Sequence, residues 1–137
     1  MVSKTDRLKF TFRKYERLRR RKEIDFVLQY GKKVFINGLI LYIHKSPIEV
    51  KQSRLAVLVS SKVEKKAVKR NKFKRRIREI FRLNKHKILE PLDIVVIGTK
   101  SIIYARYKIL EEYFLEAIKK YFGIKEVADD ETIKKIS

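Results

Sequence analysis

The residues from Ala67 to Glu79 are the part of the chain whose types and spacing most directly indicate a chemistry. They read AVKRNKFKRRIRE, and more than half of them are Lys or Arg. An arginine guanidinium is a planar set of donors that grips phosphate at two points and stacks on bases. Asn71 both donates and accepts, which suits a ribose hydroxyl or a base edge. The stretch therefore predicts binding to a nucleic acid.

Side chains for catalysis or metal binding are not gathered in this way. Metal-dependent hydrolysis needs clustered carboxylates, but the acids are scattered. Three of them lie close together near the C-terminus, and we expect these to offset nearby Lys and Arg: Glu111, Glu112 and Glu116. His44 and His86 are far apart in the sequence and are expected to be solvated or half-buried rings. We expect neither a catalytic residue nor a metal site on the protein.

The composition indicates a folded protein that needs a polyanionic partner. The chain has 137 residues, and at 45% hydrophobic and 11% aromatic it is too apolar for a disordered basic tail. Its formal charge of +20 destabilises a compact monomer, and a nucleic acid offsets that charge by releasing counterions. Cysteine is absent, and no apolar run reaches the length of a signal peptide or a membrane span. We expect a cytoplasmic protein without a membrane partner.

Hydrophobic periodicity divides the chain into helices and strands. Helices are expected over 17–30, 66–84 and 106–122, and strands over 39–45, 54–60 and 93–99, with a weaker strand portion at 33–36. Turn-forming residues at 46–47 and 52–53 favour a long-looped hairpin between the strands at 39–45 and 54–60. Residues 1–16 are expected to be an arm that becomes ordered on docking, and residues 124–137 a tail. The order predicts a single RNA-binding α+β domain over 1–123, with helices packed on one sheet of about four strands.

Charged and apolar side chains separate on the helix expected over 66–84. Four large apolar side chains share an arc of roughly 100°: Phe73, Ile77, Ile80 and Phe81. An adjoining arc of roughly 140° carries five cations and one amide: Arg70, Asn71, Lys74, Arg75, Arg78 and Arg82. Apolar burial on the order of 6–10 kcal/mol exceeds the few tenths of a kcal/mol that each like-charge pair costs. Because a solvated face normally mixes charges, this acid-free face predicts a rigid docking surface.

Two other classes of protein would also use a basic helix. A ribosomal or RNA-packaging protein would share it without any link to a catalytic RNA. A helix-based DNA reader would need a tight two-helix unit and a dimer seam, whereas here a strand precedes the basic helix and no heptad repeat is present.

The basic stretch resembles the signature of the bacterial ribonuclease P protein family. In that family Ala-Val-x-Arg-Asn-x-x-Lys-Arg-x-x-Arg-Glu follows a strand that ends in Ser-Lys, and here AVKRNKFKRRIRE follows Ser61-Lys62. The resemblance covers roughly residues 10–122 and includes Arg17-Leu18, Leu41-Tyr42 and the run DIVVIGT after the basic helix.

The resemblance implies the protein subunit of a ribonucleoprotein that removes the 5′ leader from precursor tRNA. The catalytic component would be the RNA, with magnesium as its metal. The implied fold is α-β-β-β-α-β-α, with a left-handed crossover that carries the basic helix. The residues implied to contact the catalytic RNA are Lys62, Arg70, Asn71, Lys74, Arg75, Arg78 and Arg82. The leader of the precursor tRNA would lie in a cleft between the first helix and the sheet, at Ile24, Leu28 and Tyr42.

Two positions depart from the family pattern. Ile24 and Leu28 stand where the family often has Phe, and they cannot stack on a base, although Phe26 is nearby. Lys65 stands where the family commonly has Gly, so we expect either a different turn into the basic helix or a strained backbone there. Alternation alone does not fix the face of Tyr42, which is expected either in the cleft or in the core.

Overall fold

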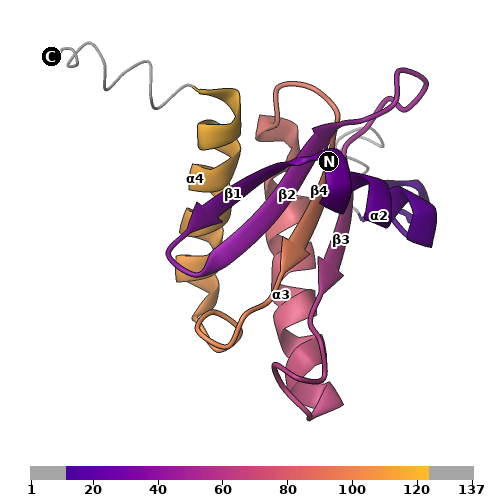
Figure 1. Ribbon diagram of the computed structural model, residues 1–137. Helices are drawn as coiled ribbons and strands as arrows, with labels where there is room; N and C mark the ends of the chain where they lie inside the picture. Colours follow the sequence, from indigo (N-terminus) through magenta and orange to yellow (C-terminus); the bar gives the residue numbers. More distant parts are fainter. Residues whose placement is uncertain (1–11, 124–137) are drawn as a thin grey trace, which may run out of the picture.

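Helices cover both faces of one four-stranded sheet in the computed structural model, which describes residues 12–123 (Figure 1). In chain order the elements are the 3-10 helix η1 (Lys14–Glu16), α2 (Arg21–Tyr30), β1 (Lys32–Ile36), β2 (Leu39–Lys45), β3 (Arg54–Leu58), α3 (Ala67–Asn84), the 3-10 helix η2 (Lys85–Lys87), β4 (Leu92–Ile97) and α4 (Tyr107–Phe122). The α+β class and the predicted order of helices and strands are confirmed. The parts of the predicted arm and tail at 1–11 and 124–137 lie outside the described residues.

The sheet has the strand order β1-β2-β4-β3. β2 is antiparallel to both of its neighbours, and β3 is parallel to β4. α3 connects this parallel pair. In Figure 1 the two strands point downwards, β4 lies to the left of β3, and α3 passes behind the sheet, so the crossover is left-handed. This hand is uncommon for a strand–helix–strand unit, and it is the one that the resemblance implied.

The expected hairpin between 39–45 and 54–60 is wrong, because β4 lies between β2 and β3. β4 is buried over almost its whole length and therefore takes a central position. The hairpin joins β1 to β2 instead, through Asn37 at φ 45° and Gly38 at φ 100°. A two-residue turn of this kind needs positive φ at both positions, which makes Asn-Gly a strong hairpin signal. That signal was present in the sequence.

The first helix begins at Arg21 rather than at residue 17. The backbone before it is extended, because the Leu18 amide donates to the Leu55 carbonyl at 2.9 Å and Arg17 forms a parallel bridge with Leu55. Leu18 is nevertheless buried in the same apolar cluster as Val27 of α2. The residues before Arg21 therefore pack with the helix without belonging to it.

Each face of the sheet has its own apolar cluster. α3 and α4 pack on one face, where Phe73, Ile77, Ile80 and Phe81 are fully buried, as predicted. α2 packs across β2 and β4 on the other face. There Leu18, Val27, Ala56 and Val95 are buried and form a smaller cluster.

Ion pairs made by Arg54 and Lys85 tie the N-terminal segment to the rest of the fold. Arg54 donates to both oxygens of Asp93, at 2.9 and 2.7 Å, and to Glu23 of α2 at 3.1 Å. The hydrogen bond to Asp93 is the largest influence on the pKa of Arg54, which is raised. Lys85 at the end of α3 binds Glu16 of η1, and both side chains are almost fully buried. Removing one partner of such a pair leaves an uncompensated charge, so these pairs fix the positions of α2 and η1.

The apolar side of α3 predicts a sharp contrast between two positions on that helix. Ile77→Ala should lower the free energy of unfolding by about 2–5 kcal/mol, because Ile77 is fully buried and its truncation leaves a cavity. Val68→Ala should change it by less than about 0.5 kcal/mol, because Val68 is 79% exposed. Urea unfolding followed by circular dichroism measures both. Equal losses at the two positions would show that this face does not anchor the helix.

Candidate nucleic-acid interface

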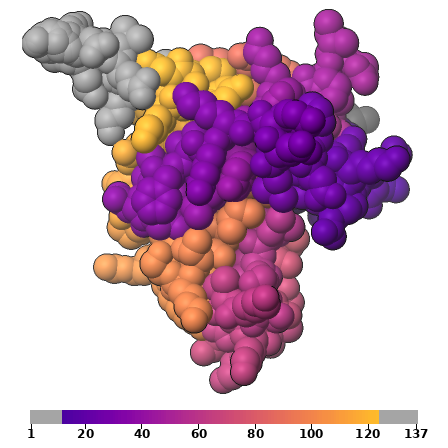
Figure 2. All heavy atoms as spheres, in the orientation of Figure 1, coloured from indigo at the N-terminus to yellow at the C-terminus, as the bar shows by residue number. Residues whose placement is uncertain are grey.

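α3 presents its charged side to solvent along a helix that extends beyond the body. Figure 2 shows the segment before α3 and its first turns, in magenta and pink, protruding at the bottom of the view. The first turn of α3 contains no acidic residue. The helix N-terminus carries a partial positive charge of its own, so cations here add to that potential. An anionic partner is thereby favoured at this end of the molecule.

Five of the seven predicted RNA-contacting side chains are available to a partner. Within residues 12–123 none of these five forms a hydrogen bond or an ion pair: Lys62, Asn71, Lys74, Arg75 and Arg78. All of them except Lys74, which is half-buried, are exposed. Their donors therefore remain unused by the fold.

Arg70 and Arg82 are engaged within the protein. Arg70 Nη1 donates to the carbonyls of Glu64 and Lys65, at 2.8 Å each, and so holds the loop before α3. Arg82 donates from Nε to Glu79 Oε1 at 3.1 Å and pairs with the second carboxylate oxygen as well. That hydrogen bond lowers the pKa of Glu79 and raises that of Arg82. Glu79 thus reaches one cation of the face that the sequence predicted to be free of acids.

The turn into α3 differs from the strained alternative considered for Lys65. Among residues 12–123, Asn37 is the only residue other than glycine with a positive φ, so Lys65 does not adopt the left-handed conformation. The Lys66 amide donates to Glu64 Oε2 at 3.0 Å, and Tyr104 donates to the other oxygen of the same carboxylate. These bonds, together with those from Arg70, form a turn that needs no glycine.

Other cations on α3 attach the helix to the fold. Arg76 Nη1 donates to the Ala105 carbonyl at 2.8 Å, and the Lys69 ammonium lies 5.5 Å from the centre of the Tyr104 ring. Both contacts join α3 to the segment that precedes α4. The charges of this helix are therefore divided between one flank that fixes it and another that faces solvent.

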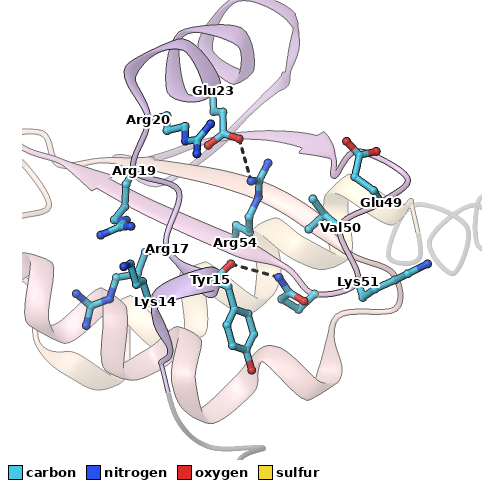
Figure 3. Close-up of a pocket in the computed structure, with 11 residues that line it drawn as sticks. Lys14, Tyr15, Arg17, Arg19, Arg20, Glu23, Glu49, Val50, Lys51 and Arg54 are labelled. Carbon is cyan, nitrogen blue, oxygen red and sulfur yellow. Dashed lines mark hydrogen bonds and ion pairs between the residues drawn. The ribbon is translucent and has the colours of Figure 1, made fainter.

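A second basic surface, which the sequence interpretation missed, lies between η1 and the loop that joins β2 to β3 (Figure 3). We call it the basic pocket. It has a volume of about 580 Å³, and its wall includes five cations besides Arg54: Lys14, Arg17, Arg19, Arg20 and Lys51. Its two carboxylates are Glu23, which binds Arg54, and Glu49 in the loop. The Tyr15 carbonyl accepts a hydrogen bond from Gln52 at 3.2 Å, which joins the two walls.

The basic pocket was not predicted because the first helix was expected to begin at residue 17 rather than at Arg21. A helix over residues 17–30 would distribute the arginines of RLRRRKE around its circumference. Because residues 17–20 are extended along β3, Arg17, Arg19 and Arg20 instead line one wall of the pocket. Arg17 also lies close enough to Arg78 for its charge to lower the pKa of Arg78, after the larger effect of partial burial. Arg17 and Arg19 also line a smaller pocket together with Arg78 of α3, so the basic pocket adjoins the exposed side of α3 at these residues.

The predicted leader cleft lies on the opposite face of the sheet from α3. Ile24 and Leu28 of α2 and Tyr42 of β2 are half-buried and pack against the same cluster, together with Leu58 and Ile97. Tyr42 sits on this face because its neighbours Leu41 and Ile43 point into the main core. The three predicted residues thus come together at the smaller apolar cluster, and Tyr42 lies outside the core beneath α3 and α4.

Acidic and histidine side chains do not converge in the described part of the chain. Among residues 12–123 no group of three or more His, Asp or Glu side chains is arranged to hold a metal ion. Glu111 accepts a hydrogen bond from Asn84 at 2.8 Å. His44 packs its ring edge-to-face on Phe26 of α2 at 5.1 Å between centroids. No helix in this part of the structure is both long enough and apolar enough to span a bilayer.

Comparison with known proteins identifies the family. The family model described as Ribonuclease P matches residues 12–122. The chain belongs to the ribonuclease P protein family. It is thus a protein component of ribonuclease P, a ribonucleoprotein endonuclease of tRNA processing, and it has an RNA partner.

Individual relatives agree with this assignment. The ribonuclease P protein component of Syntrophus aciditrophicus is 38% identical over 100 residues, which cover 71% of this chain and 82% of that protein. The solved structure of the Thermotoga maritima RNase P protein in complex with 1-(4-fluorophenyl)-2-thiourea has a TM-score of 0.67 at 34% identity, covering 75% of this chain and 97% of that one. The RNase P protein of Staphylococcus aureus gives a TM-score of 0.67 at 26% identity, covering 77% and 94%.

The exposed side of α3 predicts how RNA binding responds to salt. Arg75→Ala should weaken binding to a ribonuclease P RNA and reduce the slope of log affinity against log salt by about 0.7–0.9. The slope falls because binding releases fewer counterions when one phosphate contact is lost. Lys119→Ala is the matched control, since Lys119 is an exposed cation near the end of α4. Filter binding across a salt series measures both variants. A slope that Arg75→Ala leaves unchanged would show that this guanidinium does not touch phosphate.

Proposed function

We propose that the chain binds the catalytic RNA of ribonuclease P through α3 and the basic pocket, binds the 5′ leader of precursor tRNA in the α2 cleft, and thereby assists removal of the leader. One observation carries this proposal. A rigid helix, anchored by fully buried Phe73 and Ile77, holds Asn71, Arg75 and Arg78 on one exposed side without using their donors. Membership of the family supplies the identity of the RNA.

Binding to the catalytic RNA rests on shape as well as charge. Phosphate contacts position a protein on a nucleic acid without reading sequence. Because the cations of α3 and of the basic pocket adjoin where Arg17 and Arg78 line a common pocket, a folded RNA with closely spaced phosphates fits them better than a single extended strand. Asn71, with a donor and an acceptor, is suited to a ribose hydroxyl within that contact.

Binding to the leader rests on the second face of the sheet. The half-exposed ring of Tyr42 offers a surface for an unpaired base, with Ile24 and Leu28 as an apolar wall. Base stacking on an aromatic ring tolerates any sequence, which suits leaders of different sequence. The two aliphatic side chains add contact area but no stacking.

The chemistry of cleavage is assigned to the RNA. The described part of the chain gathers no carboxylates or imidazoles suited to a metal, so its residues do not fit a resident magnesium ion. We propose that magnesium is held by the RNA component. The protein would contribute by neutralising phosphate repulsion between the catalytic RNA and the precursor, and by orienting the leader.

Reconstitution tests this proposal. Addition of the chain to a bacterial ribonuclease P RNA, at near-physiological salt and limiting magnesium, should raise the rate of precursor-tRNA cleavage. Cleavage is followed by the release of the labelled leader, and bovine serum albumin is the protein control. The same rate at every concentration of the chain would contradict the proposal.

Substitution of Tyr42 distinguishes binding of the leader from binding of the catalytic RNA. Tyr42→Ala should lower the affinity of the reconstituted enzyme for precursor tRNA by about fivefold or more, because one stacking surface is lost. Its affinity for mature tRNA without a leader should not change. Tyr42→Phe keeps the ring and should bind like the original chain. An equal loss for both tRNAs would show that Tyr42 does not contact the leader.

A further inference from the structure

The flank of α2 that faces away from Ile24 and Leu28 carries two aromatic rings, and one of them, Phe26, contacts both Tyr30 of α2 and His44 of β2. The Phe26 ring centroid lies 4.9 Å from that of Tyr30 and 5.1 Å from that of His44 on β2. Phe26 remains 48% exposed and Tyr30 60% exposed. We call these three residues the aromatic shelf. Large exposed rings that touch one another are a costly arrangement for a surface without a partner.

A cavity of about 480 Å³ opens beside the shelf, between Phe26 and the end of β2. Its wall is largely apolar and includes Pro47, while Lys22 and Lys45 lie at its rim. Ligand pockets commonly have volumes of about 300–1,000 Å³. The space therefore accommodates a planar ring the size of a nucleobase.

The charge around the cavity favours an anionic ligand. Its two carboxylates, Glu23 and Asp93, both accept hydrogen bonds from Arg54. Together with Lys22 and Lys45, Arg54 gives the wall three cations against these two carboxylates. Lys22 and Lys45 are exposed cations, and Lys45 makes only an exposed ion pair with Glu90 at 3.6 Å. An aromatic surface flanked by cations, with its acids already paired, matches the chemistry of a base and its neighbouring phosphates.

We propose that the aromatic shelf is a second subsite for single-stranded RNA, in which an unpaired base stacks on Phe26 and adjacent phosphates lie near Lys22 and Lys45. This inference rests on the proposed function, because the leader of precursor tRNA is the single strand that reaches α2. α2 is about 10 Å across, so one strand that crosses it contacts both the cleft and the shelf. The shelf supplies the stacking that Ile24 and Leu28 on the other flank cannot provide.

The composition of the chain gives a direct reporter for this subsite. The sequence contains no tryptophan, so Phe26→Trp places a single indole on the shelf and keeps an aromatic ring there. A single-stranded oligoadenylate of about ten nucleotides, long enough to fill one single-strand binding site, should quench its fluorescence to a saturating level. An abasic ribose-phosphate oligomer of the same length should not, because it offers charge without a base. Leu89→Trp, at a position that is 70% exposed and outside the shelf, should show no saturable quenching.

Affinity gives the second readout. The double variant Phe26→Ala and Tyr30→Ala should bind the oligoadenylate about fivefold more weakly or worse, at the low end of the effect of a lost stacking ring. Its circular dichroism spectrum should match that of the original chain, because both rings are substantially exposed. Unchanged affinity would overturn the proposal.

A Tyr42→Trp reporter separates failure of this subsite from failure of the proposed function. Quenching at Tyr42→Trp with none at Phe26→Trp would overturn the subsite and leave leader binding in the cleft intact. No fluorescence quenching at either position, together with no stimulation of precursor-tRNA cleavage, would contradict both proposals. A dimer that dissociates on Phe26→Ala in sedimentation would show instead that the shelf binds a second copy of the chain, which also overturns the proposal.

Discussion

The burial of one apolar side of α3 against the sheet is the interaction on which the rest of the structure depends. The helix carries a dense set of cations, has no acid in its first turn, and lacks a side-chain cap at Lys66, so its own electrostatics oppose it. Phe73, Ile77, Ile80 and Phe81 are completely buried, and at roughly 1.5–3 kcal/mol each they outweigh that repulsion. Because packing rather than charge balance holds the helix, its exposed cations need no partners within the protein. A polyanion is the ligand that relieves the remaining repulsion.

The cations of this protein fall into two groups with different roles. Arg54, Arg70, Arg76 and Lys85 use their donors inside the molecule, where they fix α2, the loop before α3, the segment before α4 and η1. Arg75, Arg78 and Lys62 make no bond within residues 12–123 and face solvent. The number of basic residues does not distinguish the two groups. They are distinguished by whether a carboxylate or a backbone carbonyl lies within reach of the cation. This division lets a protein with a formal charge of +20 fold before it meets its RNA.

Most helices and strands could be predicted from the local sequence pattern. The wrong predictions concern features that depend on contacts between residues distant in the sequence. The 3.6-residue period of α3 placed the four buried apolar side chains correctly, and the apolar run near Asp93 predicted the strand that forms β4. The strand order could not be predicted from local pattern, because the place of β4 between β2 and β3 depends on its burial on both faces. The start of α2 was misplaced because Leu18 satisfies its amide on β3, a contact remote in sequence. The basic pocket was missed for the same reason. Helical spacing predicted the face of α3 on which the proposed RNA-contacting residues lie. Only the side-chain geometry shows that two of them, Arg70 and Arg82, are bonded within the protein.

Directed hydroxyl-radical cleavage tests whether the exposed side of α3 docks on the RNA of ribonuclease P, as proposed. The absence of cysteine allows a single iron chelate to be tethered at Lys72→Cys, on the exposed part of α3, or at Lys119→Cys on α4. Hydroxyl radicals from the α3 site should cut the bound RNA in a few discrete places, and those from the α4 site should cut it weakly or not at all. Strong discrete cleavage from the α4 site with none from the α3 site would contradict docking through α3.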